Sequence, residues 1–304
     1  MATFHFERLR LRGVVCACLA GLFLRIVPPL AGQEQSYFSP ENILRFANSL
    51  YQDKDYMRAA AEYLRYLSYG NAPPSVAASL YFKIGSCYRY ARDYAKSISA
   101  FQLILADYPK SEQAEDSSFQ IAFCHFLGGR YAESLAASEA FSLRAGSEAM
   151  KRKLAQLKCL NYLYQKDWEH ADRCLRITDG QAVQDPLTDA LKGFISQGKT
   201  IPRKSPFLGG VLSALIPGAG KIYAGRTSDG LLSFLTIAAT GWQAYEGFHE
   251  SGSRSAKGWI YGSLSALFYL GNIYGSVAAV RIFNEQSENR LLDKVGITVN
   301  VLFQ

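Results

Sequence analysis

Apolar residues are spread unevenly along this 304-residue chain, and the longest apolar runs lie in its final third. Gly230–Phe248 has 19 residues and one charge, Glu246, and the run Gly258–Phe283 has no charge from Trp259 through Val280. A helix of 19 residues rises ~28 Å, close to the thickness of a bilayer's hydrocarbon core. The pattern therefore predicts two membrane-spanning helices, at about 230–248 and 258–280. A buried soluble hairpin is the alternative, because both runs are rich in Gly and Ser.

A shorter apolar run, Phe207–Ile216, precedes these two and ends at a glycine-rich string. The string has the pattern PGxGxxYxG, formed by Pro217, Gly218, Gly220, Tyr223 and Gly225. Glycines at this density break a helix and let two backbones approach closely. We expect a short re-entrant helix, then an irregular turn with Lys221 and Tyr223 facing lipid headgroups. The string resembles the small two-helix membrane domains found at the ends of bacterial envelope proteins, which implies a location and no chemistry.

The second apolar run carries two GxxxG pairs, Gly258 with Gly262 and Gly271 with Gly275. At 100° per residue the two pairs lie on roughly opposite faces of a helix. One pair is expected to contact the first span, and the other a second copy of the chain or another protein. Glycine is frequent in membrane helices, so the spacing has a second explanation without any partner.

Residues 1–32 have the pattern of an export signal. Arg8, Arg10 and Arg12 precede a 12-residue apolar core, and Pro28–Gly32 supplies a breaker and small residues. This core is too short to span a bilayer comfortably, so we expect cleavage near Ala31 or Gly32, with an uncleaved anchor as the alternative.

Residues 40–177 repeat, with aromatic residues at spacings of 38, 37 and 37: Tyr56, Tyr94, Tyr131 and Trp168. Small residues stand nine positions before and three positions after each aromatic. A third recurring position lies four residues beyond the second small residue, seven after the aromatic. In these three sets the residues are Ala47, Gly85, Ala122 and Cys159; Ala59, Ser97, Ser134 and Ala171; and Tyr63, Phe101, Ser138 and Leu175. Small residues let two helices cross closely, so the pattern predicts an all-α solenoid of about four two-helix units.

These units resemble the tetratricopeptide repeat, with Pro109 closing the second unit where that family often has proline. The long period and the segment Asp107–Ser111 resemble the envelope branch of the family. That branch includes the repeat lipoprotein of outer-membrane barrel assembly and the periplasmic coordinator of the Tol–Pal system. The chain departs from the pattern at Ser138, where a large residue is usual, and at Lys158, before the fourth small site. The resemblance implies a protein-binding solenoid without naming the partner.

In such a solenoid, fixed positions of the first helix of each unit line an inner groove. The resemblance places nine residues there: Phe82, Arg89, Tyr90, Phe119, Phe123, Phe126, Leu160, Leu163 and Tyr164. The groove lacks the Lys, Asn and Arg that hold a peptide's terminal carboxylate in some family members. We expect an apolar helix or extended segment of an envelope protein as partner. Packing between neighbouring repeats is the alternative role of these side chains.

The charge distribution and the types of reactive residue exclude several classes of function. The net charge of +7 comes from the two ends, because residues 33–198 carry 19 basic and 19 acidic residues, so no nucleic-acid partner is expected. The four later cysteines, Cys87, Cys124, Cys159 and Cys174, have no metal-ligand spacing. A Cys159–Cys174 disulfide stays open for an oxidising compartment. Neither a metal, a cofactor nor an enzymatic activity is expected, since no nucleophile stands near a base.

The sequence thus predicts a signal peptide at 1–32, a repeat solenoid at 33–198 and a linker at 199–206. A helix from Leu187 to Gln197, begun by Asp185-Pro186, caps the solenoid. A membrane domain at 207–283 and a tail at 284–304 follow, and Val295–Phe303 in the tail alternates like a β-strand.

We expect an inner-membrane scaffold that serves envelope assembly or secretion, with its repeats in the periplasm. The alternatives are a structural or channel-like oligomer gated by its repeats, a three-span topology, and a soluble-bundle enzyme.

Overall fold

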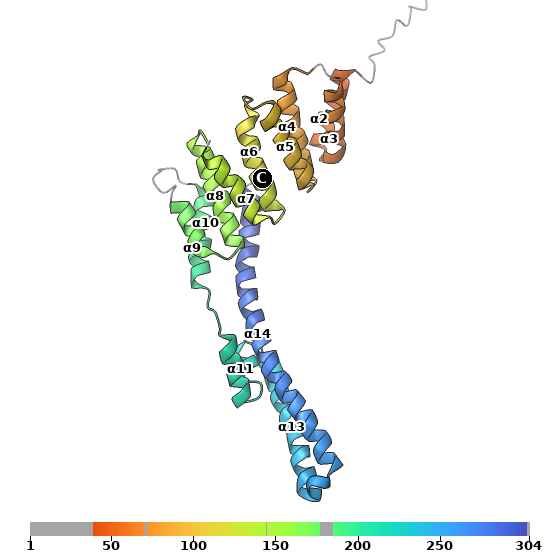
Figure 1. Ribbon diagram of the computed structural model, residues 1–304, viewed down its shortest axis with the longest axis vertical. Helices are drawn as coiled ribbons and strands as arrows, with labels where there is room; N and C mark the ends of the chain where they lie inside the picture. Colours follow the sequence, from red (N-terminus) through yellow and green to blue (C-terminus); the bar gives the residue numbers. More distant parts are fainter. Residues whose placement is uncertain (1–38, 70–71, 144, 177–184, 303–304) are drawn as a thin grey trace, which may run out of the picture. The chain divides into compact units, whose positions relative to one another are not determined.

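The computed structural model describes residues 39–302, apart from 70–71, 144 and 177–184. The predicted signal peptide lies outside these residues. The chain forms two compact units, Met1–Gly129 and Arg130–Gln304. Regular structure in the described ranges is helical throughout, as Figure 1 shows, and the predicted all-α fold is confirmed.

The described residues of the first unit form five helices, each packed against the next in the α2–α3, α3–α4, α4–α5 and α5–α6 pairs. They are α2 (Pro40–Gln52), α3 (Tyr56–Ser68), α4 (Pro74–Tyr90), α5 (Tyr94–Asp107) and α6 (Gln113–Leu127). The second unit begins with α7 (Tyr131–Ser142), α8 (Glu148–Tyr164), α9 (Trp168–Arg176) and α10 (Pro186–Thr200). It continues with α11 (Pro206–Leu215), α12 (Ala219–Tyr223), α13 (Thr227–Ser251), the short 3₁₀ helix η1 (Gly252–Arg254) and α14 (Ala256–Leu302).

The repeating small positions are the places where helices cross. Every residue in the three predicted sets is buried, from Ala47 in α2 to Leu175 in α9. In the second repeat, a Cβ added to Gly85 would lie 2.7 Å from the Phe101 ring, so only glycine admits that ring. The Ser97 hydroxyl donates to the Gly85 carbonyl at 2.8 Å. The predicted helical-repeat fold is therefore confirmed, with packed helix pairs inside each compact unit, α2–α3 and α4–α5 in the first and α8–α9 in the second.

The turn inside each repeat has one recurring geometry. Lys54, Arg92 and Lys166 each have a φ of 62°, and Gly129 has 71° at the matching place in the third repeat. The aspartate that follows caps the next helix in three repeats: Asp55, Asp93 and Asp167 accept from the backbone N–H three residues on. An accepting carboxylate satisfies an orphan N–H at a helix start, which fixes where the second helix begins.

The expected capping helix is α10. Asp185 caps it by accepting the Thr188 N–H at 3.3 Å, with Pro186 at the first helical position. The helix contacts α8 and α9. Gly198 lies directly under the Trp168 ring, which leaves no room for a side chain.

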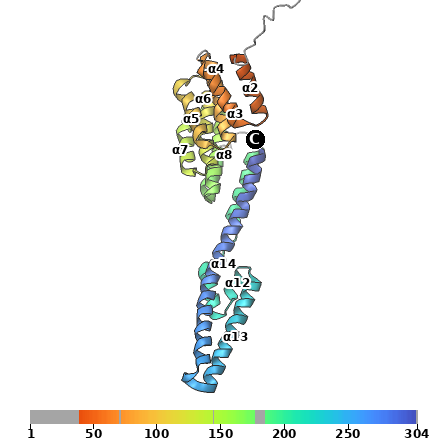
Figure 2. The same cartoon turned by 90° about the vertical axis from the view of Figure 1, so that its right-hand side faces the viewer.

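The C-terminal part of the second unit is built on a helical hairpin. Both views show α13 and α14 side by side and antiparallel (Figures 1 and 2), with α11 and α12 packed against α14. The predicted β-like tail is wrong, because α14 continues as a helix to Leu302. Its buried residues Leu291, Val295 and Val299 recur every four residues, which is a helical period. The alternation of Val and Ile in this tail was compatible with both structures.

Among the described helices, one is long and apolar enough to cross a membrane by length and composition, Ala256–Val299. It includes the predicted second span. The predicted first span lies inside α13, where Gln243 and Glu246 interrupt the apolar run, and α13 is less apolar than α14 over a membrane-spanning length.

The four described cysteines are free thiols. Cys87, Cys124 and Cys159 are buried, and Cys174 is partly exposed. Burial raises the pKa of Cys87 to about 12 and also raises the pKa of Cys159. We expect iodoacetamide at pH 8 to alkylate Cys174 first and to spare Cys87 and Cys159 until the protein is unfolded, as read by peptide mass spectrometry. Equal labelling of all three thiols in the native protein would contradict this.

Candidate functional site

In the first unit, most of the predicted groove residues are packed inside the repeats. Phe119, Phe123 and Phe126 are only 5%, 6% and 6% exposed. Their rings stack along α6, with centroids 6.0 and 6.2 Å apart. Phe82 packs edge-on against Phe101 at 5.3 Å. These aromatics therefore contribute to the core of the repeats.

The remaining two residues of this set form an accessible patch. Tyr90 is 44% exposed and stacks on Tyr56, with ring centroids 4.8 Å apart. The Arg89 guanidinium lies 4.3 Å from the centre of the Tyr90 ring and 5.8 Å from that of Phe123. We call Arg89, Tyr90 and Tyr56 the aromatic patch. A planar cation over aromatic faces is a common anchor at protein interfaces.

In the second unit, one of the predicted groove residues of α8, Tyr164, lies beside the chain's own last helix. Leu160 and Leu163 are fully buried, and Tyr164 is half-buried. A Cβ added to Gly296 of α14 would come within 3.1 Å of the Tyr164 hydroxyl. Burial, together with the nearby Tyr131 and the Asp293 charge, raises the pKa of Tyr164. The face predicted to receive a partner segment is here partly covered by α14.

Glu288 joins three segments of the second unit. Its carboxylate accepts from the Lys166 ammonium at 2.8 Å and from the Arg203 guanidinium at 2.7 Å. The Lys204 N–H donates to Asn284 Oδ1 at 2.9 Å, and Asn284 Nδ2 donates back to the Lys204 carbonyl at 2.8 Å. The segment between α10 and α11, predicted as a simple linker, is thus held against α14.

Acid should loosen this junction. Burial raises the pKa of Glu288, but the hydrogen bond and charge of Lys166, with the Arg203 charge, outweigh it and hold the pKa below its ordinary 4.5. The stabilisation is therefore complete above pH 4.5 and is lost as the pH falls through the lower native pKa. We expect Glu288→Gln to lower the stability of this junction by about 1–2 kcal/mol at pH 7. The stability of the variant should also depend less on pH in the acid range.

Hydrogen exchange of residues 286–299 in the full chain measures this loss, at pH 7 and pH 4. Glu285→Gln, on the exposed side of the same turn, is the matched control. An unchanged exchange rate in Glu288→Gln would show that the ion pairs do not hold the helix.

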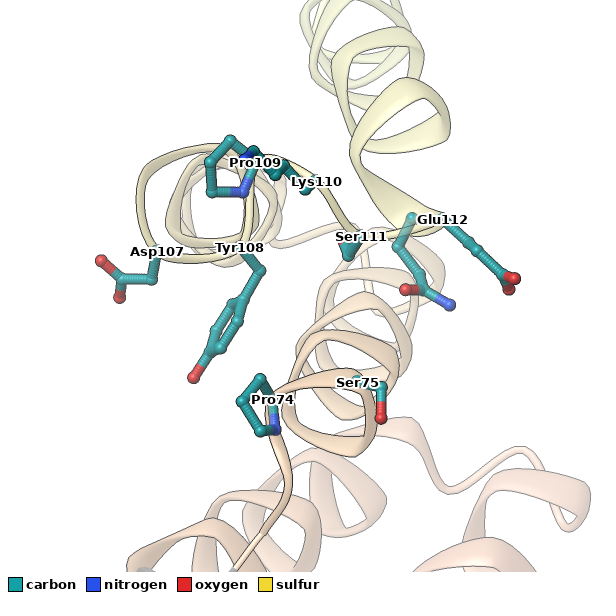
Figure 3. A pocket seen from close by; sticks show the side chains of 9 residues that line it. Pro74, Ser75, Asp107, Tyr108, Pro109, Lys110, Ser111 and Glu112 are labelled. Atoms are coloured by element: carbon teal, nitrogen blue, oxygen red, sulfur yellow. The ribbon is translucent and has the colours of Figure 1, made fainter.

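The sequence did not single out a pocket in the repeat array, which Figure 3 shows. The pocket has a volume of about 600 Å³ and lies between the start of α4 and the α5–α6 connection. The Tyr108 side chain points toward Pro74, and Asp107, Lys110 and Glu112 also line the pocket. Tyr108 also contacts Tyr81, with ring centroids 6.2 Å apart. The lining therefore combines the Tyr108 and Pro74 side chains with three charged residues. The segment Asp107–Ser111 stood out in the sequence only as a connection.

The PGxGxxYxG string forms the junction of α11, α12 and α13. Pro217 follows the end of α11, and Gly218 has a φ of 85° with its Cα against the Gly230 carbonyl. Gly220 lies against the Gly209 carbonyl, and its N–H donates to Ser213 Oγ at 2.9 Å. Further along, Gly225 also has a φ of 85°, and the Tyr223 hydroxyl accepts the Ser205 N–H at 3.2 Å. The motif brings backbones together, as glycine permits.

The two GxxxG pairs have different neighbours. Gly258 and Gly262 face Phe248, on α13, where a Cβ on Gly258 would lie 2.7 Å from the ring. Gly275 faces Lys221 of α12, and a Cβ on Gly271 would meet nothing within 4 Å. Contact of the second pair with another copy stays a prediction. Within the described ranges, no three His, Cys, Asp or Glu residues are grouped so that they could hold a metal ion.

The fold and its recurring turns define a helical-repeat protein with an apolar C-terminal hairpin. The tetratricopeptide repeat family model matches residues 79–111, which cover most of α4, all of α5 and the Pro109 turn. Together with the helical architecture, this match supports a tetratricopeptide repeat protein. Such repeats are typically non-enzymatic and mediate protein–protein interaction. No curated protein and no solved structure matches the chain.

Proposed function

We propose that this protein is a scaffold anchored in the bacterial inner membrane. Its repeats face the periplasm and dock another envelope protein during assembly or secretion. The repeat array supports the scaffold role, and the C-terminal hairpin supports the anchor. The export-signal pattern in residues 1–32 supports the periplasmic orientation.

One observation carries the membrane placement. Of the 28 large hydrophobic side chains exposed in the described part of the chain, 22 lie between Phe207 and Ile297. They include Leu232 at 66%, Leu267 at 67% and Tyr274 at 78% exposure. Monomeric soluble proteins rarely expose so continuous an apolar surface, whereas a bilayer covers it without penalty.

Aromatic residues at the tip of the hairpin support the same placement. Trp242, Tyr245 and Trp259 are each more than 60% exposed and lie near the turn between α13 and α14. The Trp259 indole donates to the Ser253 carbonyl at 2.9 Å. Tryptophan and tyrosine collect at membrane interfaces because their rings are apolar and one end is polar.

Extraction of membranes tests the anchor. We expect the full chain to stay in the pellet after alkaline carbonate washing and to dissolve in detergent. Protease added to intact spheroplasts should then degrade the repeats. Release by carbonate would reject the anchor, and protected repeats would reject the periplasmic orientation.

The aromatic patch is the surface that we propose for docking. A photo-reactive phenylalanine at position 90 in the full chain should crosslink to one discrete envelope protein. The control is the same probe at Leu143, which is 86% exposed on a turn. Equal crosslinking at both positions would reject the patch.

A channel-like oligomer is the second candidate, because Gly271 of α14 has an open side toward which another helix could pack. Replacement of Gly271 and Gly275 by leucine separates the two functions. If this variant loses its function in cells but still crosslinks at position 90, the oligomer is favoured.

A further inference from the structure

A pocket of about 300 Å³ lies inside the C-terminal hairpin, where α12, α13 and α14 meet. Its polar side is formed by Lys221, Ser233 and Asn272, one from each helix. Its apolar side is formed by Leu232, Leu267 and Phe268, which are 66%, 67% and 41% exposed. The pocket therefore combines a polar interior with walls that continue into the apolar surface of the hairpin.

Lys221 is held in place and keeps donors for a ligand. Its ammonium donates to Ser233 Oγ at 2.7 Å, and Ser233 in turn donates to the Asp229 carbonyl at 2.7 Å. The lysine stem passes Gly275 of α14, where an added Cβ would lie 3.4 Å from its Cε. Within the described part of the chain, no carboxylate forms an ion pair with this ammonium. An ammonium has three N–H donors, so two remain for an anion.

Asn272 supplies the second polar group. The residue is only 3% exposed, and its Nδ2 makes one long hydrogen bond, 3.4 Å, to the Ser213 carbonyl. Its Oδ1 is buried without a donor in the described structure. A buried acceptor without a donor is unfavourable, so a ligand hydroxyl that donates to this oxygen would be stabilising.

We propose that this pocket binds the headgroup of an anionic glycerophospholipid that also carries a hydroxyl, such as phosphatidylglycerol. The lipid phosphate accepts from the Lys221 ammonium, a headgroup hydroxyl donates to Asn272 Oδ1, and an acyl chain lies along Leu232, Leu267 and Phe268. A fatty-acid carboxylate has no hydroxyl for Asn272, and a free phosphate leaves the apolar walls without a function. The inference rests on the proposed placement of the hairpin in a bilayer.

Native mass spectrometry of the full-length protein in detergent tests the proposal. We expect one phosphatidylglycerol to be retained in roughly tenfold preference to phosphatidylcholine, as one ion pair with a hydrogen bond would give. Phosphatidic acid, which has the anion without the headgroup hydroxyl, should bind with intermediate strength. Lys221→Met should abolish the preference. Arg281→Met, an exposed cation that does not line the pocket, should keep it.

Three outcomes would overturn the site. They are a wild type without lipid preference, an equal loss in both variants, and inorganic phosphate that displaces phosphatidylglycerol at millimolar concentration. Circular dichroism of Lys221→Met checks that the variant is folded, and the same lipid comparison on the wild type does not depend on that variant. Release of the protein by carbonate washing would instead reject the membrane anchor, so the two failures are distinguishable.

Discussion

Gly220→Ala should separate α11 and α12 from the hairpin, with a loss of more than about 3 kcal/mol in the stability of the C-terminal part. The added Cβ would overlap the Gly209 carbonyl and Ser213 Oγ. One of these groups is backbone, so no rotamer change can relieve the contact. Thermal unfolding of the full chain in detergent, followed by circular dichroism and by protease cleavage near residue 216, measures the effect.

Two other glycines of the C-terminal part serve as comparisons, with smaller expected losses of stability. Gly225→Ala has no steric neighbour within 4 Å, but its φ of 85° should cost about 1–2 kcal/mol in backbone strain. Gly271→Ala has an ordinary helical backbone and no neighbour, so it should be neutral or stabilising by up to ~1 kcal/mol. The expected order of destabilisation is therefore 220, 225, 271. If Gly220→Ala behaved like Gly271→Ala, the close backbone approach in the PGxGxxYxG junction would be wrong.

The second large effect is expected in the repeats, where Gly85→Ala should destabilise the array by about 2–3 kcal/mol. Alanine is the better helix former by ~1 kcal/mol, so a net loss would show that packing outweighs propensity. The physical cause is the Phe101 ring, two atoms of which lie 2.7 Å from the position of the new Cβ. Chemical denaturation of the full chain, followed by circular dichroism, measures the change.

A double-mutant cycle identifies the ring as the cause. Phe101→Leu alone should cost about 1–2 kcal/mol through lost core volume, but in the Gly85→Ala background it should recover part of the loss. Gly193→Ala in α10 is the matched control, because its Cβ would meet nothing within 4 Å, and it should stabilise slightly. Additive losses at positions 85 and 101 would argue against a direct contact.

The sequence predicted the repeats well because their geometry depends on side-chain size at fixed intervals. Gly85 and Phe101 are 16 positions apart, and both belong to the recurring positions of the repeat. In the structure they are the residues in contact where two helices cross. The left-handed turns gave no such signal, since Lys54, Arg92 and Lys166 occupy a conformation for which glycine is the usual marker.

The C-terminal part was less predictable, for two physical reasons. Charges at Arg281, Glu285 and Glu288 mark the end of an apolar run, but a helix does not need apolar residues to continue. The Arg203–Glu288 ion pair also joins residues 85 positions apart, and the sequence around either residue does not indicate this pairing. The Lys221 pocket was missed in the same way, because its polar groups come from three separate helices.

The unbroken course of α14 has a mechanical consequence. The helix has 47 residues and no proline, so it forms a strut ~70 Å long. If the hairpin is anchored in a bilayer as we propose, a thinner or thicker membrane would change the tilt of this helix. The far end of the helix, at Gly296 and Glu288, would then move relative to Tyr164 and Lys166 of the fourth repeat. Bilayer thickness would in this way set how much of the Tyr164 side chain of α8 is covered by α14.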